Sequence, residues 1–146
     1  MVPLKFYFLP VLCICSSGFT FSNELKNNAK SNNLLYYEDI LEAQKDKTIL
    51  IIDIREDSEI RETGKLPGSI HIPMGKVINV LTECSNEEFE KQYNRTKPTF
   101  DTKIILSCLK GLRSGKLLPK MLQLGFRNMF SYAGGWMDWV QHQKQN

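Results

Sequence analysis

Cys108 is the residue of this chain whose surroundings point most directly to chemistry. It follows the mainly apolar run 104–107 and precedes the segment Leu109-Lys110-Gly111-Leu112-Arg113-Ser114. This pattern predicts a strand, a tight loop and a helix, with backbone N–H groups and the positive end of the helix dipole directed at the cysteine sulfur. A thiol in such a place loses its proton more readily than a free cysteine, whose pKa is about 8.5. We therefore expect a reactive thiolate in a cradle that binds a small anion.

Positive charge gathers beside Cys108, where Lys110 and Arg113 flank it and Lys116 follows. The whole chain of 146 residues carries a net charge of only +3 and has no basic tract interleaved with aromatic residues. Nucleic acid is therefore not an expected partner. Arg113 has three possible roles at this stage: it holds the shape of the loop, binds the substrate, or lies solvated on the surface.

The first 18 residues differ in kind from the rest. Lys5 precedes an uncharged, apolar run at 6–15, and small residues follow up to Gly18. This pattern predicts a secretory signal peptide that is cleaved near Gly18, with mitochondrial targeting or an uncleaved, cytoplasmic protein as alternatives. The run is too short to span a membrane, so no stable membrane anchor is expected. Residues 19–33 are rich in Asn, Ser and Lys and predict a flexible linker before a domain at 34–146.

The cysteines and histidines do not suggest a metal site. Two of the four cysteines lie within the first 18 residues, so that Cys84 and Cys108 remain. An oxidising compartment could pair them, although an unpaired Cys84 in a loop is the preferred interpretation. The two histidines, His71 and His142, lie far apart in the sequence, and we expect His71 to be structural. No metal and no other cofactor is expected.

Strands and helices alternate through the predicted domain. Apolar runs predict strands at 48–54, 69–72, 104–107 and 127–132. Amphipathic or capped segments predict helices at 37–41, 56–63, 76–81, 85–93, 117–124 and 136–141. Pro119 is expected to kink the helix at 117–124 or to make its start irregular. The alternation predicts an α/β domain with a mostly parallel sheet covered on both faces.

Four segments in order carry a family resemblance. They are Ile52-Asp53-Ile54-Arg55, residues 64–73, the loop from Cys108 to Arg113 with Ser114 after it, and Tyr132-Ala133-Gly134-Gly135-Trp136. Over residues 34–142 the chain thereby resembles the rhodanese family, and more narrowly its small single-domain thiosulfate sulfurtransferases. The resemblance implies a rhodanese-like α/β fold, in which a parallel five-stranded sheet is flanked by helices on both faces.

The resemblance also implies an activity centred on Cys108. The thiolate takes the outer, sulfane sulfur of thiosulfate, sulfite leaves, and a thiol such as glutathione, or cyanide, accepts the sulfur from the persulfide. A positive residue at the position of Lys110 goes with thiosulfate as the donor, and residues 109–114 form the substrate-binding loop. Asp53 and Arg55 are expected to brace this loop, and Trp136 to line the mouth of the site.

Three alternatives differ from this interpretation. A phosphatase is disfavoured because only four residues separate Cys108 from Arg113, whereas the tyrosine phosphatase loop has one residue more. The smaller ring of N–H donors suits a terminal sulfur better than a phosphate. The chain could instead be a non-catalytic rhodanese-like binding or regulatory module, but the presence of the cysteine disfavours this. A third possibility is a carrier that transfers persulfide sulfur to a partner protein. The oligomeric state is not predicted.

Overall fold

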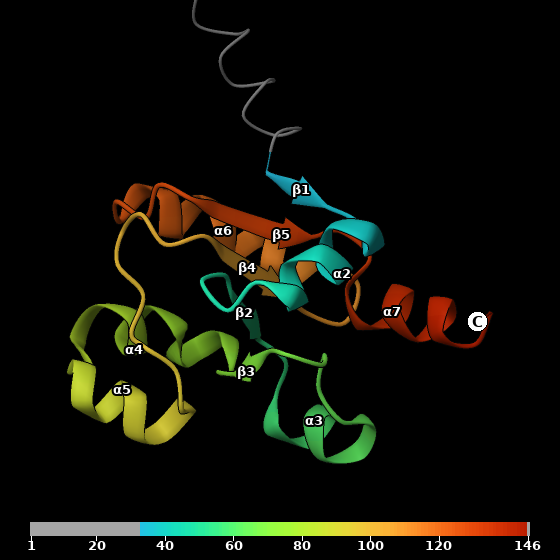
Figure 1. Ribbon diagram of the computed structural model, residues 1–146, viewed down its shortest axis with the longest axis horizontal. Coiled ribbons are helices and arrows are strands. Elements are labelled where there is room, and N and C mark those ends of the chain that lie inside the picture. Colours follow the sequence, from blue (N-terminus) through green and yellow to red (C-terminus); the bar gives the residue numbers. More distant parts are fainter. Residues whose placement is uncertain (1–32, 146) are drawn as a thin grey trace, which may run out of the picture.

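A computed structural model describes residues 33–145 of the chain. The predicted signal peptide at 1–18 and nearly all of the predicted linker lie outside these residues. Figure 1 shows strands and helices alternating along the described part. The strands are β1 Leu34–Leu35, β2 Leu50–Asp53, β3 Ile70–His71, β4 Ile104–Ser107 and β5 Met129–Tyr132. The α-helices are α2 Tyr37–Lys45, α3 Asp57–Thr63, α4 Val77–Glu83, α5 Asn86–Tyr93, α6 Leu112–Gln123 and α7 Gly135–Gln143, and the short η1 Met74–Lys76 is a 3-10 helix.

The five strands form one sheet in the order β1-β5-β4-β2-β3, and every neighbouring pair is parallel. The two-residue strands β1 and β3 occupy the edges, while β2 and β4 are buried along their whole length. Continuous burial explains why these strands are apolar runs without alternation. The expected parallel five-stranded α/β fold is confirmed.

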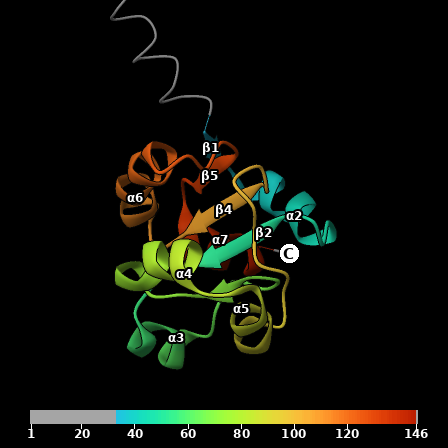
Figure 2. The same ribbon diagram turned by 90° about the vertical axis from the view of Figure 1, so that its left-hand side faces the viewer.

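Helices cover both faces of the sheet (Figures 1 and 2). The helices α2 and α7 pack on one face, where Ile40 and Trp139 join Ile51 and Ile105 in one apolar cluster. The helices α4, α5 and α6 contribute to the cluster on the other face, which includes Cys108. The sulfur of Cys108 therefore belongs to the α6 side of the sheet.

Several predicted element boundaries differ from the observed ones, and one strand was not predicted. The helix predicted at 117–124 begins at Leu112 and runs through Pro119. Pro119 cannot pair with the carbonyl of Gly115, but both residues are exposed and water can hydrate that carbonyl. The last strand begins at Met129 rather than at residue 127. The edge strand β1 was missed, because two residues carry no periodicity.

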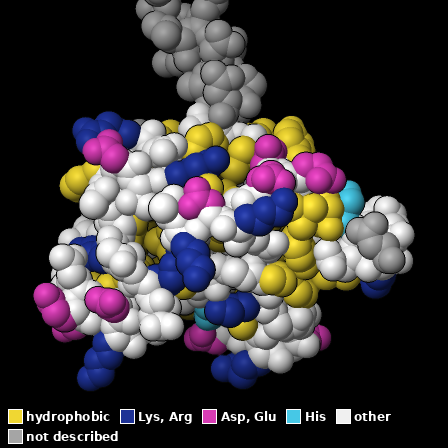
Figure 3. All heavy atoms as spheres, in the orientation of Figure 1, with side chains coloured by type: hydrophobic (Ala, Val, Ile, Leu, Met, Phe, Trp, Pro, Cys, Tyr) yellow, Lys and Arg dark blue, Asp and Glu magenta, His cyan; other side chains and the backbone are white. Residues whose placement is uncertain are grey.

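The described surface is mixed in charge. Figure 3 shows Lys and Arg side chains interspersed with Asp and Glu over the face turned to the viewer. Among residues 33–145 no helix combines the length and the apolar character needed to cross a membrane.

Candidate active site

Cys108 follows the last residue of β4, and the loop after it leads directly into α6. Gly111, the residue before α6, has a φ of 77°, in the left-handed region that favours glycine. A Cβ at this position would also lie 2.0 Å from the carbonyl oxygen of Ala133. The loop therefore turns tightly against the segment after β5, and only glycine fits at the point of contact.

The start of α7 holds the carbonyl groups of this loop. The N–H of Trp136 donates to the Cys108 carbonyl at 2.8 Å, and the N–H of Met137 donates to the Leu109 carbonyl at 3.0 Å. The first N–H groups of a helix have no partner within the helix, so these contacts satisfy the N–H groups of α7 as well as the loop carbonyls. Gly135 permits this approach, because a Cβ there would lie 2.3 Å from the Cys108 carbonyl oxygen. With the loop carbonyls held by α7, the loop N–H groups are free to face the sulfur.

The sulfur of Cys108 is buried but well provided with hydrogen-bond donors, since the residue is only 1% exposed. Burial by itself raises the pKa of the thiol. The backbone N–H and the hydroxyl of Ser114, with the N–H groups of Lys110 and Arg113, outweigh that effect and hold the pKa of Cys108 below its usual value. A lowered pKa of the Cys108 thiol is what the loop sequence predicts, because hydrogen-bond donors directed at the sulfur favour the thiolate.

Two buried serines lie next to the sulfur. The Ser114 hydroxyl oxygen is 3.6 Å from the Cys108 sulfur, and the same hydroxyl donates to the Gly111 carbonyl oxygen at 3.0 Å. The hydroxyl of Ser131, on β5, donates to Ser114 Oγ at 2.8 Å. Sequence reasoning missed Ser131, although a serine within a buried, otherwise apolar strand is a signal that could have drawn attention to it.

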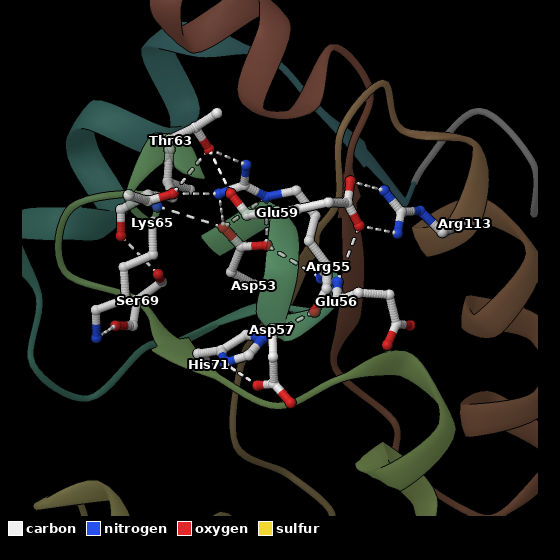
Figure 4. Close-up of polar contacts among 12 residues, drawn as sticks. Asp53, Arg55, Glu56, Asp57, Glu59, Thr63, Lys65, Ser69, His71 and Arg113 are labelled. Atoms are coloured by element: carbon white, nitrogen blue, oxygen red, sulfur yellow. Dashed lines mark hydrogen bonds and ion pairs between the residues drawn. The ribbon is translucent and has the colours of Figure 1, made fainter. Parts of the chain in front are cut away.

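Arg113 is held by a carboxylate from a distant helix. Its guanidinium donates two hydrogen bonds of 2.6 Å to the two carboxylate oxygens of Glu59, on α3 (Figure 4). These bonds, which outweigh a partial burial, hold the pKa of Glu59 at about 2. Of the three roles considered for Arg113, the geometry favours holding the loop, because its guanidinium is already paired with the Glu59 carboxylate. No local sequence pattern predicted Glu59 as its partner.

Asp53 and Arg55 form an ion pair that is completely buried at the end of β2. The Arg55 guanidinium contacts both Asp53 oxygens, and also the Thr63 hydroxyl and the Gly64 carbonyl (Figure 4). Its central carbon lies 4.6 Å from the ring centre of Trp136, which is a cation–π contact. The structure thus brings the three residues expected to support the site into one group.

His71, the last residue of β3, contacts the backbone of Arg55. Its Nε2 is 2.8 Å from the Arg55 carbonyl oxygen, and its Nδ1 is 3.6 Å from the Asp57 carboxylate. These contacts tie β3 to the segment after β2, which agrees with a structural role. Among residues 33–145 no group of three or more potential ligands is placed to hold a metal ion.

The remaining loop residues form the rim of the site. Lys110 and Leu112 are exposed, Leu112 to 72%, and Leu109 is half-buried. Lys110 is thus free to meet an anion that approaches from solvent. Cys84 and Cys108 are both free thiols, and Cys84 lies in the short connection between α4 and α5, which confirms the expectation of an unpaired cysteine in a loop.

Comparison of sequences finds similar proteins in animals and fungi. A mouse protein named "Thiosulfate sulfurtransferase/rhodanese-like domain-containing protein 3" is 37% identical over 107 residues, which are 73% of this chain and 68% of that protein. The Saccharomyces cerevisiae protein "Thiosulfate sulfurtransferase RDL2, mitochondrial" is 30% identical over 101 residues, which are 69% of this chain and 66% of that protein.

Solved structures show the same fold. The human single-domain sulfurtransferase TSTD1 superposes with a TM-score of 0.66 at 20% identity, covering 75% of this chain and 96% of that one. The structure of the Saccharomyces cerevisiae single-domain sulfurtransferase RDL2 superposes with a TM-score of 0.62 at 24% identity, covering 78% of this chain and 93% of that one. The sequence pattern of the rhodanese-like domain matches residues 36–142, which include the loop, both ion pairs and the start of α7. The chain therefore belongs to the rhodanese-like domain family.

Proposed function

We propose that this protein is a thiosulfate sulfurtransferase that carries sulfur as a persulfide on Cys108. The observation that supports this most strongly is the environment of the sulfur. It is buried, yet three backbone N–H groups and one hydroxyl favour its ionised form. A buried cysteine with a purely structural role has no need of such donors, because an apolar environment alone would keep it neutral.

The reaction consists of two displacements at sulfur. In the first, the Cys108 thiolate attacks the outer sulfur of thiosulfate, a new sulfur–sulfur bond forms, and sulfite leaves with the electron pair of the broken bond. In the second, an acceptor thiolate or cyanide attacks the outer sulfur of the persulfide, and the Cys108 thiolate is released. The N–H groups of the loop stabilise the negative charge on sulfur before and after each step.

Lys110 is the residue we assign to the sulfonate end of thiosulfate. Its ammonium is exposed on the loop, whereas the Arg113 guanidinium is occupied by Glu59. Sulfur transfer as the general activity is supported by the similar proteins, several of which carry sulfurtransferase in their names. The thiol acceptor that we expect is glutathione or a similar small thiol.

The cellular compartment of the protein is a separate proposal. The yeast relative carries the word mitochondrial in its name, and this favours the mitochondrial alternative over the secretory one. A mitochondrial matrix also supplies reduced thiols, which a persulfide enzyme needs as acceptors. Fluorescence of a fusion at the C-terminus, with and without residues 1–18, tests this assignment: mitochondrial signal that is lost on truncation supports it, and secretion of the fusion contradicts it.

The activity is tested by sulfur transfer from thiosulfate to cyanide and to glutathione. We expect the full chain and a Cys84→Ser variant to be active, and Cys108→Ser to be inactive. Cys84 is the matched control, because it is the other free thiol of the described residues. If the freshly reduced protein transfers sulfur to neither acceptor, the proposal fails and the binding-module alternative gains support.

A further inference from the structure

Ser131 is a polar residue at a place where the fold calls for an apolar one. Alternate residues of β5 face opposite sides of the sheet, and Met129 belongs to the cluster on the α6 side. Ser131 faces the same side and is completely buried. A buried hydroxyl is costly unless it is hydrogen-bonded, and this one donates to Ser114 Oγ at 2.8 Å. The contact with Ser114 is therefore the reason that a serine is tolerated there.

Ser114 stands between Ser131 and the sulfur. A serine hydroxyl has one hydrogen to donate and two lone pairs with which to accept. Because Ser131 donates to Ser114, the Ser114 hydrogen points away from Ser131. Two acceptors are then within reach of the Ser114 hydroxyl: the Gly111 carbonyl oxygen lies 3.0 Å from Ser114 Oγ, and the Cys108 sulfur lies 3.6 Å from it.

The protonation of Cys108 decides between these two acceptors. A neutral thiol can donate its own hydrogen to Ser114, which then donates to Gly111. A thiolate has no hydrogen to give and attracts the Ser114 hydrogen, since hydrogen bonds to charged acceptors are the stronger ones. We propose that Ser131 is a positioning residue for Cys108: its hydroxyl keeps Ser114 in the orientation from which Ser114 donates to the ionised sulfur.

This inference deepens the proposed function, because the same thiolate would take up sulfur from thiosulfate. Other charged groups also act on the loop. Arg113 of α6 is paired with Glu59 of α3, the Asp53–Arg55 pair lies at the end of β2, and Lys110 is exposed on the loop itself. Substitutions at Ser131 leave all five of these groups unchanged, so a difference in pH-dependence reports on the hydroxyl chain.

The test is the pH-dependence of alkylation of Cys108 by iodoacetamide in the full-length chain. Trypsin releases Cys108 in the peptide 104–110, separate from every other cysteine, so mass spectrometry follows this thiol alone. We expect Ser131→Ala to move the alkylation profile to higher pH and to lower the rate near neutral pH by roughly 3- to 10-fold.

Ser107→Ala is the matched control. Ser107 is as deeply buried and directly precedes Cys108, but its hydroxyl oxygen has no hydrogen-bond partner among the described residues. We expect its profile to stay close to that of the wild type. A shift as large as that of Ser131→Ala would mean that any hydroxyl lost near the loop has the same effect, and it would overturn the inference.

Thr and Val at position 131 separate the hydroxyl from the shape of the side chain, because the two residues are nearly equal in volume. We expect Ser131→Thr to retain the wild-type profile and Ser131→Val to behave like Ser131→Ala. Identical profiles for Thr and Val, or a wild-type profile for Ala, would overturn the inference. Alkylation needs no sulfur donor, so a failure of sulfur transfer would count against the proposed function and not against the role of Ser131.

Discussion

Arg113 and Glu59 lie 54 residues apart in the chain and are joined by two parallel hydrogen bonds of 2.6 Å. The pair connects the first turn of α6, which follows the cysteine loop, to α3 on another part of the fold. Bidentate pairs of arginine and carboxylate fix orientation as well as distance. We infer that α3 contributes to the shape of the loop through this pair.

Glu59→Gln is expected to lower the free energy of unfolding at neutral pH by about 1–2 kcal/mol, because a charge-assisted, partly buried pair is lost. The pKa of Glu59 is about 2 in the folded protein, against 4.5 ordinarily. The stabilisation is therefore complete above the ordinary value of 4.5 and is lost as the pH falls from there toward 2. Urea unfolding of both proteins at neutral and acidic pH measures this difference.

Asp101→Asn is the control for that prediction. Asp101 and Arg127 make a bidentate pair of the same length, but both side chains are about 70% exposed. Loss of this pair is therefore expected to lower the free energy of unfolding less than loss of the Glu59–Arg113 pair. A Glu59→Gln variant whose deficit stays the same from neutral to acidic pH would show that the carboxylate charge is not what stabilises the loop.

The central architecture could be predicted from the sequence, whereas the partners of the loop could not. The strands β2 and β4 are continuous apolar runs, and the Ser85–Glu88 capping box at the start of α5 is local, so both were recognisable. The contact between Glu59 and Arg113 depends on tertiary structure that no local pattern encodes. For Ser131 the sequence shows only a serine within an apolar strand, and its contact with Ser114 forms only because β5 packs beside α6.

The buried pair of Asp53 and Arg55 leads to a second prediction. Asp53→Asn leaves an uncompensated guanidinium in a place without solvent, and we expect it to cost about 3–5 kcal/mol of unfolding free energy. Chemical denaturation measures the loss. The double variant Asp53→Asn, Arg55→Met removes both charges and is expected to be more stable than Asp53→Asn alone. A double variant that is less stable than the single one would contradict this explanation.

Gly111 and Gly115 allow a matched comparison within one segment. Gly111→Ala places a Cβ 2.0 Å from the Ala133 carbonyl oxygen at a positive φ, whereas a Cβ at Gly115 meets nothing within 4 Å. We expect Gly111→Ala to displace the loop, lower the melting temperature and slow alkylation of Cys108. Gly115→Ala is expected to stabilise α6 by about 0.5–1 kcal/mol and to leave alkylation unchanged. Equal effects of the two substitutions would argue against a tightly packed loop.

Lys110→Gln tests which residue binds the donor. Because the ammonium is assigned to the sulfonate, we expect the KM for thiosulfate to rise roughly 5- to 20-fold while kcat changes less, and the difference to shrink as salt is added. Lys116→Gln is the control, since Lys116 is also exposed and lies further along α6. An unchanged KM in Lys110→Gln, or an equal rise in both variants, would remove Lys110 from the site.

The most direct test of the account is the mass of the protein after thiosulfate alone has been added, with no acceptor present. We predict that the reduced full-length chain gains the mass of one sulfur atom, that the gain maps to the peptide containing Cys108, and that glutathione removes it with release of its persulfide. The Cys84→Ser variant should behave in the same way, and Cys108→Ser should gain nothing. An added sulfur on another residue, or no added sulfur on an active enzyme, would contradict the account.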